Sequence, residues 1–151
     1  MLENEINDAL KKAIKDRDTN VVSVLRMMLS EIKNYRIANL IKSGPTPDEG
    51  VIGVLQKMAK RYKESIDSFE KGGRADLVEK ESRELDILKK FLPEALTDIE
   101  VEKIVCEAIS QAGASSMKDM PAVMRVVMPL VKGRADGRLV NEIVRKKLGG
   151  C

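Results

Sequence analysis

The sequence contains no histidine, and this absence removes several kinds of active site. Histidine is the commonest general base and the commonest zinc ligand, and it activates the nucleophile of many serine and cysteine enzymes. Glycine-rich phosphate loops of the Walker and dinucleotide-binding types are also missing from the sequence. We therefore expect no catalytic residues, no metal site and no cofactor in this chain.

Cysteine is scarce as well, with only Cys106 and Cys151 present. They form no CxxC pair and no disulfide framework, which is typical of a reducing cytosol. Cys106 is expected on the buried face of a helix. No apolar run approaches the roughly 18 residues that a membrane helix needs, and the acidic N-terminus lacks the basic and apolar regions of a signal peptide. The sequence predicts a cytoplasmic protein that has no membrane segment.

Aromatic residues make up only 3% of the chain, whereas hydrophobic residues make up 43% and charged residues 34%. Most of the apolar residues are Leu, Ile, Val, Ala and Met, and no segment alternates in the way that strands do. This composition predicts an all-α fold. The small number of aromatic rings also constrains function. Tyr62, Phe69 and Phe91 are expected on apolar faces, so only Tyr35 is left to stack on a base. Stacking on splayed single-stranded bases is therefore not expected.

Apolar residues recur at steps of three and four in seven segments, each of which predicts an amphipathic helix. The expected ranges are about 2–16, 20–43, 47–71, 75–91, 98–112, 119–131 and 137–148. Thr46 with Glu49, and Thr97 with Glu100, have the pattern of capping boxes. The Leu92-Pro93 break comes just before the second of these. The sequence predicts an antiparallel bundle of about four helices in residues 1–94 and a small three-helix domain in residues 95–151.

The turn between the last two expected helices carries three basic residues, Lys132, Arg134 and Arg138. Gly133 can take the left-handed conformation that ends one helix, and Asp136 can N-cap the next. The amides at a helix start, with three cations around them, are able to hold a phosphate. Alternatively, Lys132 offsets the dipole of its own helix and the two arginines are merely solvated. The residues themselves leave both interpretations open.

The net charge of +3 is unevenly distributed along the chain. Residues 117–151 hold eight basic and three acidic residues, a net charge of +5, whereas residues 97–116 have a net charge of −3. Such a concentration is typical of a surface that contacts a phosphate backbone, and a solvated helical surface is the alternative. The candidate nucleic-acid-binding residues are Lys132, Arg134, Arg138, Arg125, Arg145, Lys146 and Lys147.

Methionines recur at helical spacing on the sixth expected helix. They are Met117, Met120, Met124 and Met128. This pattern is typical of an adaptable core face, and we take that as the interpretation. If the face is exposed instead, it is a docking groove for a partner helix.

Acidic residues gather near the start of the fourth expected helix, where Glu79, Glu81 and Glu84 follow one another closely. Two acids three residues apart are able to bind a metal ion. More often they pair with a nearby base or with the helix start. Arg83 is the base within reach, and our interpretation is that these acids pair with Arg83 or with the helix start.

The tail of the sequence carries a recognisable pattern of residues. They are Val123-Met124, Met128-Pro129, Lys132-Gly133-Arg134-Ala135-Asp136-Gly137, Val140, Ile143-Val144 and Leu148. This pattern resembles the domain shared by the YqeY-like proteins and the B subunit of the glutamine-dependent aspartyl/glutamyl-tRNA amidotransferase. One departure is visible, because the family usually has Gly-Lys before Val-Met and this chain has Pro121-Ala122. A basic side chain is thereby lost from the first turn of that helix.

The resemblance to YqeY-like proteins extends over nearly the whole chain. It implies a helical N-terminal bundle followed by a small helical domain. The front part matches at Leu25-Arg26, Ile32-Lys33-Asn34, Tyr62, Ser65, Phe69, Arg74-Ala-Asp-Leu77, Glu81, Glu84-Leu85, Ile87-Leu88 and Leu92-Pro93.

Through the amidotransferase subunit, the resemblance implies a tRNA-related role. It implies tRNA as a partner, together with an amidotransferase or tRNA-synthetase component, and neither DNA nor a membrane. A link to carbon–nitrogen ligase chemistry with glutamine as amido donor comes from the resemblance alone, since the chemistry of the amidotransferase subunit lies in its other domains. The alternative function is a protein–protein adaptor that makes no nucleic-acid contact.

Overall fold

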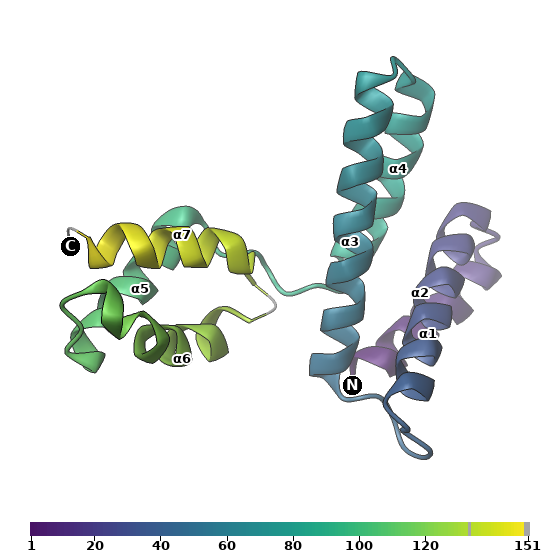
Figure 1. Ribbon diagram of the computed structural model, residues 1–151. Helices are drawn as coiled ribbons and strands as arrows, with labels where there is room; N and C mark the ends of the chain where they lie inside the picture. Colours follow the sequence, from purple (N-terminus) through teal and green to yellow (C-terminus); the bar gives the residue numbers. More distant parts are fainter. Residues whose placement is uncertain (133, 150–151) are drawn as a thin grey trace. The chain divides into compact units, whose positions relative to one another are not determined.

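The computed structural model describes residues 1–132 and 134–149 (Figure 1). Within these ranges the chain forms seven α-helices and one short 3₁₀ helix and contains no strand, so the predicted all-α fold is confirmed. The chain divides into two compact units, Met1–Pro93 and Glu94–Cys151. Across the described ranges, no helix is both long and apolar enough to cross a membrane.

The N-terminal unit consists of two helical hairpins. α1 (Leu2–Lys15) packs along α2 (Thr19–Ala38), and α3 (Asp48–Lys71) packs along α4 (Ala75–Lys89). Figure 1 shows each pair running antiparallel, with a short turn between its helices. α2 contacts both helices of the second hairpin, and α1 contacts α3. The unit therefore has one shared core rather than two separate ones.

The core of the N-terminal unit takes one apolar face from each of the four helices. Full burial of one such side chain stabilises the folded state by about 1.5 to 3 kcal/mol. The fully enclosed members include Ile6, Val24, Leu25, Met28, Ile32, Val51, Leu55 and Leu88, each with an exposed fraction of 0 or 1%.

α2 is shorter than the range of 20–43 predicted from the sequence. It ends at Ala38, because Leu40 adopts a left-handed backbone conformation with a φ of 56°. The amide of Leu40 donates to the carbonyl of Ile37, and the amide of Ile41 donates to the carbonyl of Arg36 at 2.9 Å. This pair of hydrogen bonds closes the helix in the manner of a Schellman motif. The helix thus ends before the Gly44-Pro45 stop is reached.

The capping box predicted at Thr46 does not form. α3 begins at Asp48 after Pro47, and no side chain caps it. The Thr46 amide, which a capping box would satisfy from the third residue of the helix, instead donates to Oε2 of Glu3 at 2.6 Å. Thr46 is fully buried, and its hydroxyl oxygen has no hydrogen-bond partner within the described ranges.

Glu3 connects three segments of the N-terminal unit. Its carboxylate accepts from the Thr46 amide and forms an ion pair with Arg36 at 3.3 Å, while the amide of Leu2 donates to Asp48 at 2.9 Å. Burial alone would raise the pKa of the Glu3 carboxyl, but the hydrogen bond from the Thr46 amide and the charge of Arg36 hold that pKa below its usual value. The start of α1, the end of α2 and the start of α3 are therefore joined at one carboxylate.

Replacing Glu3 with Gln is expected to lower the free energy of unfolding of the N-terminal unit by about 1 to 3 kcal/mol, since hydrogen bonds to charged groups are lost. Because the folded-state pKa lies below the unfolded one, the contribution of Glu3 is fully present above the unfolded pKa. It is lost as the pH falls through the folded pKa. Urea titrations followed by circular dichroism at neutral and acidic pH measure this, and the difference between wild type and variant should shrink in acid.

Glu5→Gln is the matched control, since Glu5 lies exposed on the same helix. We expect a change within about 0.5 kcal/mol for this variant. Equal destabilisation by the two variants, or a Glu3→Gln effect that does not depend on pH, would contradict the role given to Glu3.

The C-terminal unit contains α5 (Asp98–Ala112), a 3₁₀ helix (Met117–Asp119), α6 (Met120–Val131) and α7 (Gly137–Leu148). The capping box predicted at Thr97 is confirmed, because Thr97 Oγ1 accepts from the amide of Glu100 at 3.2 Å and the Thr97 amide donates back to the Glu100 carboxylate. α5 contacts both α6 and α7, and α6 contacts α7. The core residues are Val101, Val105, Ala108, Ile109, Val123, Val127, Val131, Val140, Ile143, Val144 and Leu148.

The methionines of α6 do not form its core face, contrary to the interpretation from their spacing. Val123, Val127 and Val131 are the buried residues of this helix. Met117 is 49% exposed and Met128 is 37% exposed. Met120 and Met124 pack half-buried at the edge of the core. Cys106 of α5 is likewise half-buried rather than buried.

Candidate functional site

The corner between α6 and α7, residues 132–138, presents its three basic side chains to solvent. Lys132 follows the last residue of α6, and Arg138 lies in the first turn of α7. Lys132, Arg134 and Arg138 are all exposed, as a phosphate-binding role requires. Gly133, for which the sequence predicted a left-handed conformation, lies outside the described residues.

Arg134 also has a structural role in this corner. Its Nε donates to the carbonyl of Glu94 at 3.3 Å, and its own carbonyl accepts from the amide of Leu96 at 2.7 Å. The segment before α5 is thereby held against the α6–α7 corner. Part of the Arg134 guanidinium is occupied by this contact.

Asp136 is the N-cap of α7, as the sequence predicted. Its Oδ1 accepts from the amide of Arg138 at 3.0 Å. A carboxylate therefore lies at the helix start, which one interpretation of the sequence gave to a phosphate. Because this carboxylate occupies an amide and repels anions, it makes the helix start unfavourable for a phosphate, and the exposed side chains of the corner are the groups available to one.

Three basic side chains form the outer face of α7. Arg138, Arg145 and Lys146 are exposed, and none of their side chains forms an ion pair or hydrogen bond with the rest of the described chain. Arg138 and Arg145 are two turns apart on the same side, about 10 Å along the axis. Glu142 shares this face and lowers its net charge. We call Arg138, Arg145 and Lys146 the basic outer face.

The other two predicted contact residues differ from each other. Arg125 is exposed on α6, on the side away from the buried Val123 and Val127. Lys147 is half-buried, and its Nζ lies 3.9 Å from the Glu102 carboxylate of α5. Lys147 therefore links α7 to α5, and it is the predicted residue least available to a ligand.

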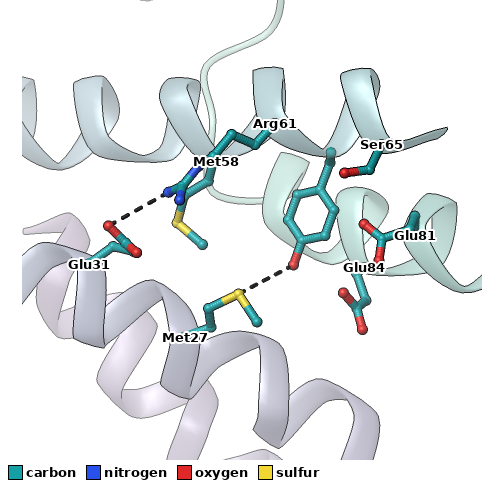
Figure 2. A pocket seen from close by; sticks show the side chains of 8 residues that line it. Met27, Glu31, Met58, Arg61, Ser65, Glu81 and Glu84 are labelled. Carbon is teal, nitrogen blue, oxygen red and sulfur yellow. Dashed lines mark hydrogen bonds and ion pairs between the residues drawn. The ribbon is translucent and has the colours of Figure 1, made fainter. Parts of the chain in front are cut away.

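The acidic patch of α4 separates into two parts. Glu79 forms an ion pair with Arg83, as the sequence suggested. Glu81 and Glu84 instead line a pocket against α2 and α3, together with Tyr62 (Figure 2). The sequence did not predict this pocket. Tyr62 of α3 lies near Glu81 and Glu84 of α4 only because of how the two helices pack. Across the described ranges, no three His, Cys, Asp or Glu side chains gather as metal ligands would.

A small all-α protein of two helical units is the class that this fold defines. The chain belongs to the YqeY-like protein family, whose model matches residues 3–148. An uncharacterised protein of Schizosaccharomyces pombe is 38% identical over 98 residues, covering 65% of this chain and 77% of that protein. "Altered inheritance of mitochondria protein 41, mitochondrial" of Pyrenophora tritici-repentis is 29% identical over 143 residues, covering 93% of this chain and 77% of that protein.

The Saccharomyces cerevisiae protein of the same name is 34% identical over 93 residues, covering 62% of this chain and 49% of that protein. The chain thus aligns with about half the length of this relative. The names of these two relatives place them in mitochondria. A cytoplasmic location for this chain, expected from its sequence, stays a prediction.

Proposed function

We propose that the C-terminal unit binds tRNA through its basic surface, and that the protein assists glutamine-dependent amidation of tRNA without catalysing a reaction itself. The observation that carries the proposal is the basic outer face of α7, whose three cations are exposed and make no ion pair within the described chain. Arg125, Lys132 and Arg134 are further exposed cations of the same unit.

The chemistry of this surface suits the backbone of a folded RNA. Exposed arginines and lysines neutralise phosphates and release counterions, which makes binding sensitive to salt. Two of the four rings, Phe69 and Phe91, are half-buried in the N-terminal unit, and Tyr62 is 7% exposed. Recognition of charge and shape therefore fits the chain better than base stacking. The link to amidation comes from the resemblance of the tail to the amidotransferase B subunit.

The test replaces Arg138, Arg145 and Lys146 with Gln. We expect tRNA affinity to fall several-fold, because three phosphate contacts are lost. The slope of log K against log salt should become shallower by about two to three units, since each contact contributes about 0.7 to 0.9. Fluorescence anisotropy with labelled bulk tRNA, titrated between about 50 and 200 mM salt, measures both quantities.

Lys57, Lys60 and Lys63 supply the matched control, because they are three exposed lysines of α3 in the other unit. Their replacement with Gln changes the net charge by the same amount and should leave the slope almost unchanged. Neither variant should alter stability by more than about 0.5 kcal/mol per residue. Equal tRNA affinity and equal salt slope for the wild type and the α7 variant would contradict the proposal.

One observation favours the adaptor alternative. Met128 is 37% exposed and Leu130 is 55% exposed at the end of α6. Exposed apolar side chains occur at many protein–protein contacts. If the tRNA titration shows no binding that depends on α7, this end of α6 becomes the leading candidate for function.

A further inference from the structure

α6 is apolar on nearly its whole surface, and the proposed function does not use that property. Arg125 is the one charged residue in the helix, and the other residues of Met120–Val131 are apolar. Only Val123, Val127 and Val131 are buried in the core of the C-terminal unit. A helix that is apolar on every side is normally buried on every side. α6 therefore presents more apolar surface than its own unit covers within the described chain.

An apolar seam runs beside the buried valines. Its members follow one another at steps of four, three and four residues, which is the spacing of the a and d positions in a coiled coil. They are Met117, Pro121, Met124 and Met128, and we call them the methionine seam. Met117 belongs to the 3₁₀ helix that runs directly into α6. Met117 and Met128 are 49% and 37% exposed, Pro121 is exposed, and Met124 is half-buried at the edge of the core.

Three exposed cations border the methionine seam at intervals of seven residues. They are Lys118 in the 3₁₀ helix, Arg125 in α6 and Lys132, the C-cap of α6. Seven residues make about two helical turns, so the three positions lie along one side of the helix, about 10 Å apart. Lys118 and Arg125 each follow directly after a d position and thus occupy the e position. In coiled coils, charged residues at e pair with the partner helix.

The structure provides no counter-ion for this row of cations. Lys118 and Arg125 form no ion pair or side-chain hydrogen bond within the described chain. No acidic residue occurs between Asp119 and Asp136. The Asp119 carboxylate itself accepts from the amides of Ser115 and Ser116. A second copy of this chain docked through the same surface would therefore place cations near cations, which is unfavourable. The matching partner is a different, acidic segment.

The residue types of the seam favour a helix over a nucleic acid or a membrane. Thioethers and proline rings have no hydrogen-bond donor for a phosphate. Helices that lie in a membrane surface usually carry Trp, Phe or Leu on their apolar face. The methionine seam contains none of these. Methionine adapts its shape to irregular gaps, and this property suits the apolar stripe of a partner helix.

We propose that the methionine seam docks an acidic amphipathic helix of a partner protein. The apolar stripe of that helix lies on the seam, and carboxylates seven residues apart face Lys118, Arg125 and Lys132. The 3₁₀ helix and α6 together cover Met117–Val131, so the contact extends over about two heptads. This partner gives the adaptor alternative a defined chemistry, and the inference does not rest on tRNA binding.

The test uses the full chain labelled with ¹³C at the methionine methyl groups and two synthetic amphipathic helices. Each peptide has about two heptads with Leu at a and d, and the residues at e and g are Glu in one peptide and Lys in the other. The Glu peptide should shift the signals of Met117, Met124 and Met128. The signals of Met28 and Met58, which lie in the core of the N-terminal unit, should stay in place. The Glu peptide should bind about tenfold or more tightly than the Lys peptide, since the Lys peptide repels the row of cations.

Arg125→Glu reverses the charge in the middle of the row. The variant should bind the Glu peptide about tenfold more weakly than the wild type does, and it should bind the Lys peptide more tightly. Lys103→Glu is the matched control, because Lys103 is an exposed lysine of α5 in the same unit and the change in net charge is the same. This control should keep the wild-type affinities for both peptides.

Met128→Gln keeps the length of the side chain but makes it polar. It should weaken binding of the Glu peptide several-fold, because apolar burial on the seam is lost. Ile99→Gln is the control, since Ile99 is 79% exposed on α5 and lies outside the seam. Its affinity should equal that of the wild type. Circular dichroism of each variant checks that the helices are retained.

Equal affinity for the two peptides, equal shifts of all methionines, or unchanged Glu-peptide binding by Arg125→Glu would overturn the proposal. Phosphatidylserine vesicles that shift the seam methionines while the Glu peptide does not would also overturn it and assign the seam to a lipid surface. The α7 variant should bind the Glu peptide as the wild type does, and Met128→Gln should bind tRNA as the wild type does. Failure of this proposal is therefore separable from failure of tRNA binding.

Discussion

A fragment of residues 94–151 is expected to unfold in one cooperative helical transition on heating. The physical reason is that α5, α6 and α7 bury their apolar faces against one another, in a core whose residues all belong to this unit. A domain of about 60 residues is marginal in stability but able to fold alone. Circular dichroism at 222 nm during a thermal melt measures the transition.

The start of the fragment should matter. A fragment that begins at Thr97 lacks Glu94 and Leu96, so it loses both contacts of these residues with Arg134. Losing a hydrogen bond and some apolar burial costs about 1 to 2 kcal/mol, which corresponds to a decrease in Tm of roughly 5 to 15 °C for a domain of this size. Gradual, non-cooperative loss of helix in the 94–151 fragment would mean that its core needs the N-terminal unit.

Leu55→Ala should lower the free energy of unfolding of the N-terminal unit by about 2 to 5 kcal/mol. Leu55 is fully buried in the core that all four helices share, and truncation leaves a cavity that the neighbouring side chains fill only in part. Urea titration followed by circular dichroism measures the change. Tryptophan fluorescence is not an option, since the sequence contains no tryptophan.

Leu40→Ala is the control, because Leu40 is 79% exposed and has little apolar contact to lose. We expect a change within about 0.5 kcal/mol. Val127→Ala should instead destabilise the C-terminal unit, since Val127 is fully buried in the core of that unit. Methyl signals of Met28 and Met120 report on the two units separately. If Leu55→Ala destabilised both units to the same extent, the chain would unfold as one cooperative body.

For the candidate nucleic-acid surface, the sequence indicated which side chains carry charge but not which of them are available. Arg138, Arg145 and Lys146 lie exposed on α7, while Lys147 pairs with Glu102 of another helix. That pairing joins residues far apart in the chain, and no local pattern reveals it. The same holds for the pocket at Tyr62, whose walls come from three helices.

The sequence by itself determined the features that depend on neighbours within about four residues. Helical spacing of apolar residues predicted the seven helices, and the Thr97 capping box and the Asp136 cap formed as predicted. In each of these caps a side chain satisfies an amide within its own first turn. Packing elsewhere does not compete for that amide, so the local pattern decides the outcome.

Tertiary structure decided the features in which distant groups compete for the same partner. The Thr46 box failed because Glu3, brought across from α1, takes the amide that the box would have used. In α6 the buried residues are Val123, Val127 and Val131 rather than the methionines, since only one stripe of a helix can face its neighbours. Which stripe is buried, and which carboxylate reaches which amide, follows from how the helices pack, and helical periodicity alone does not specify that packing.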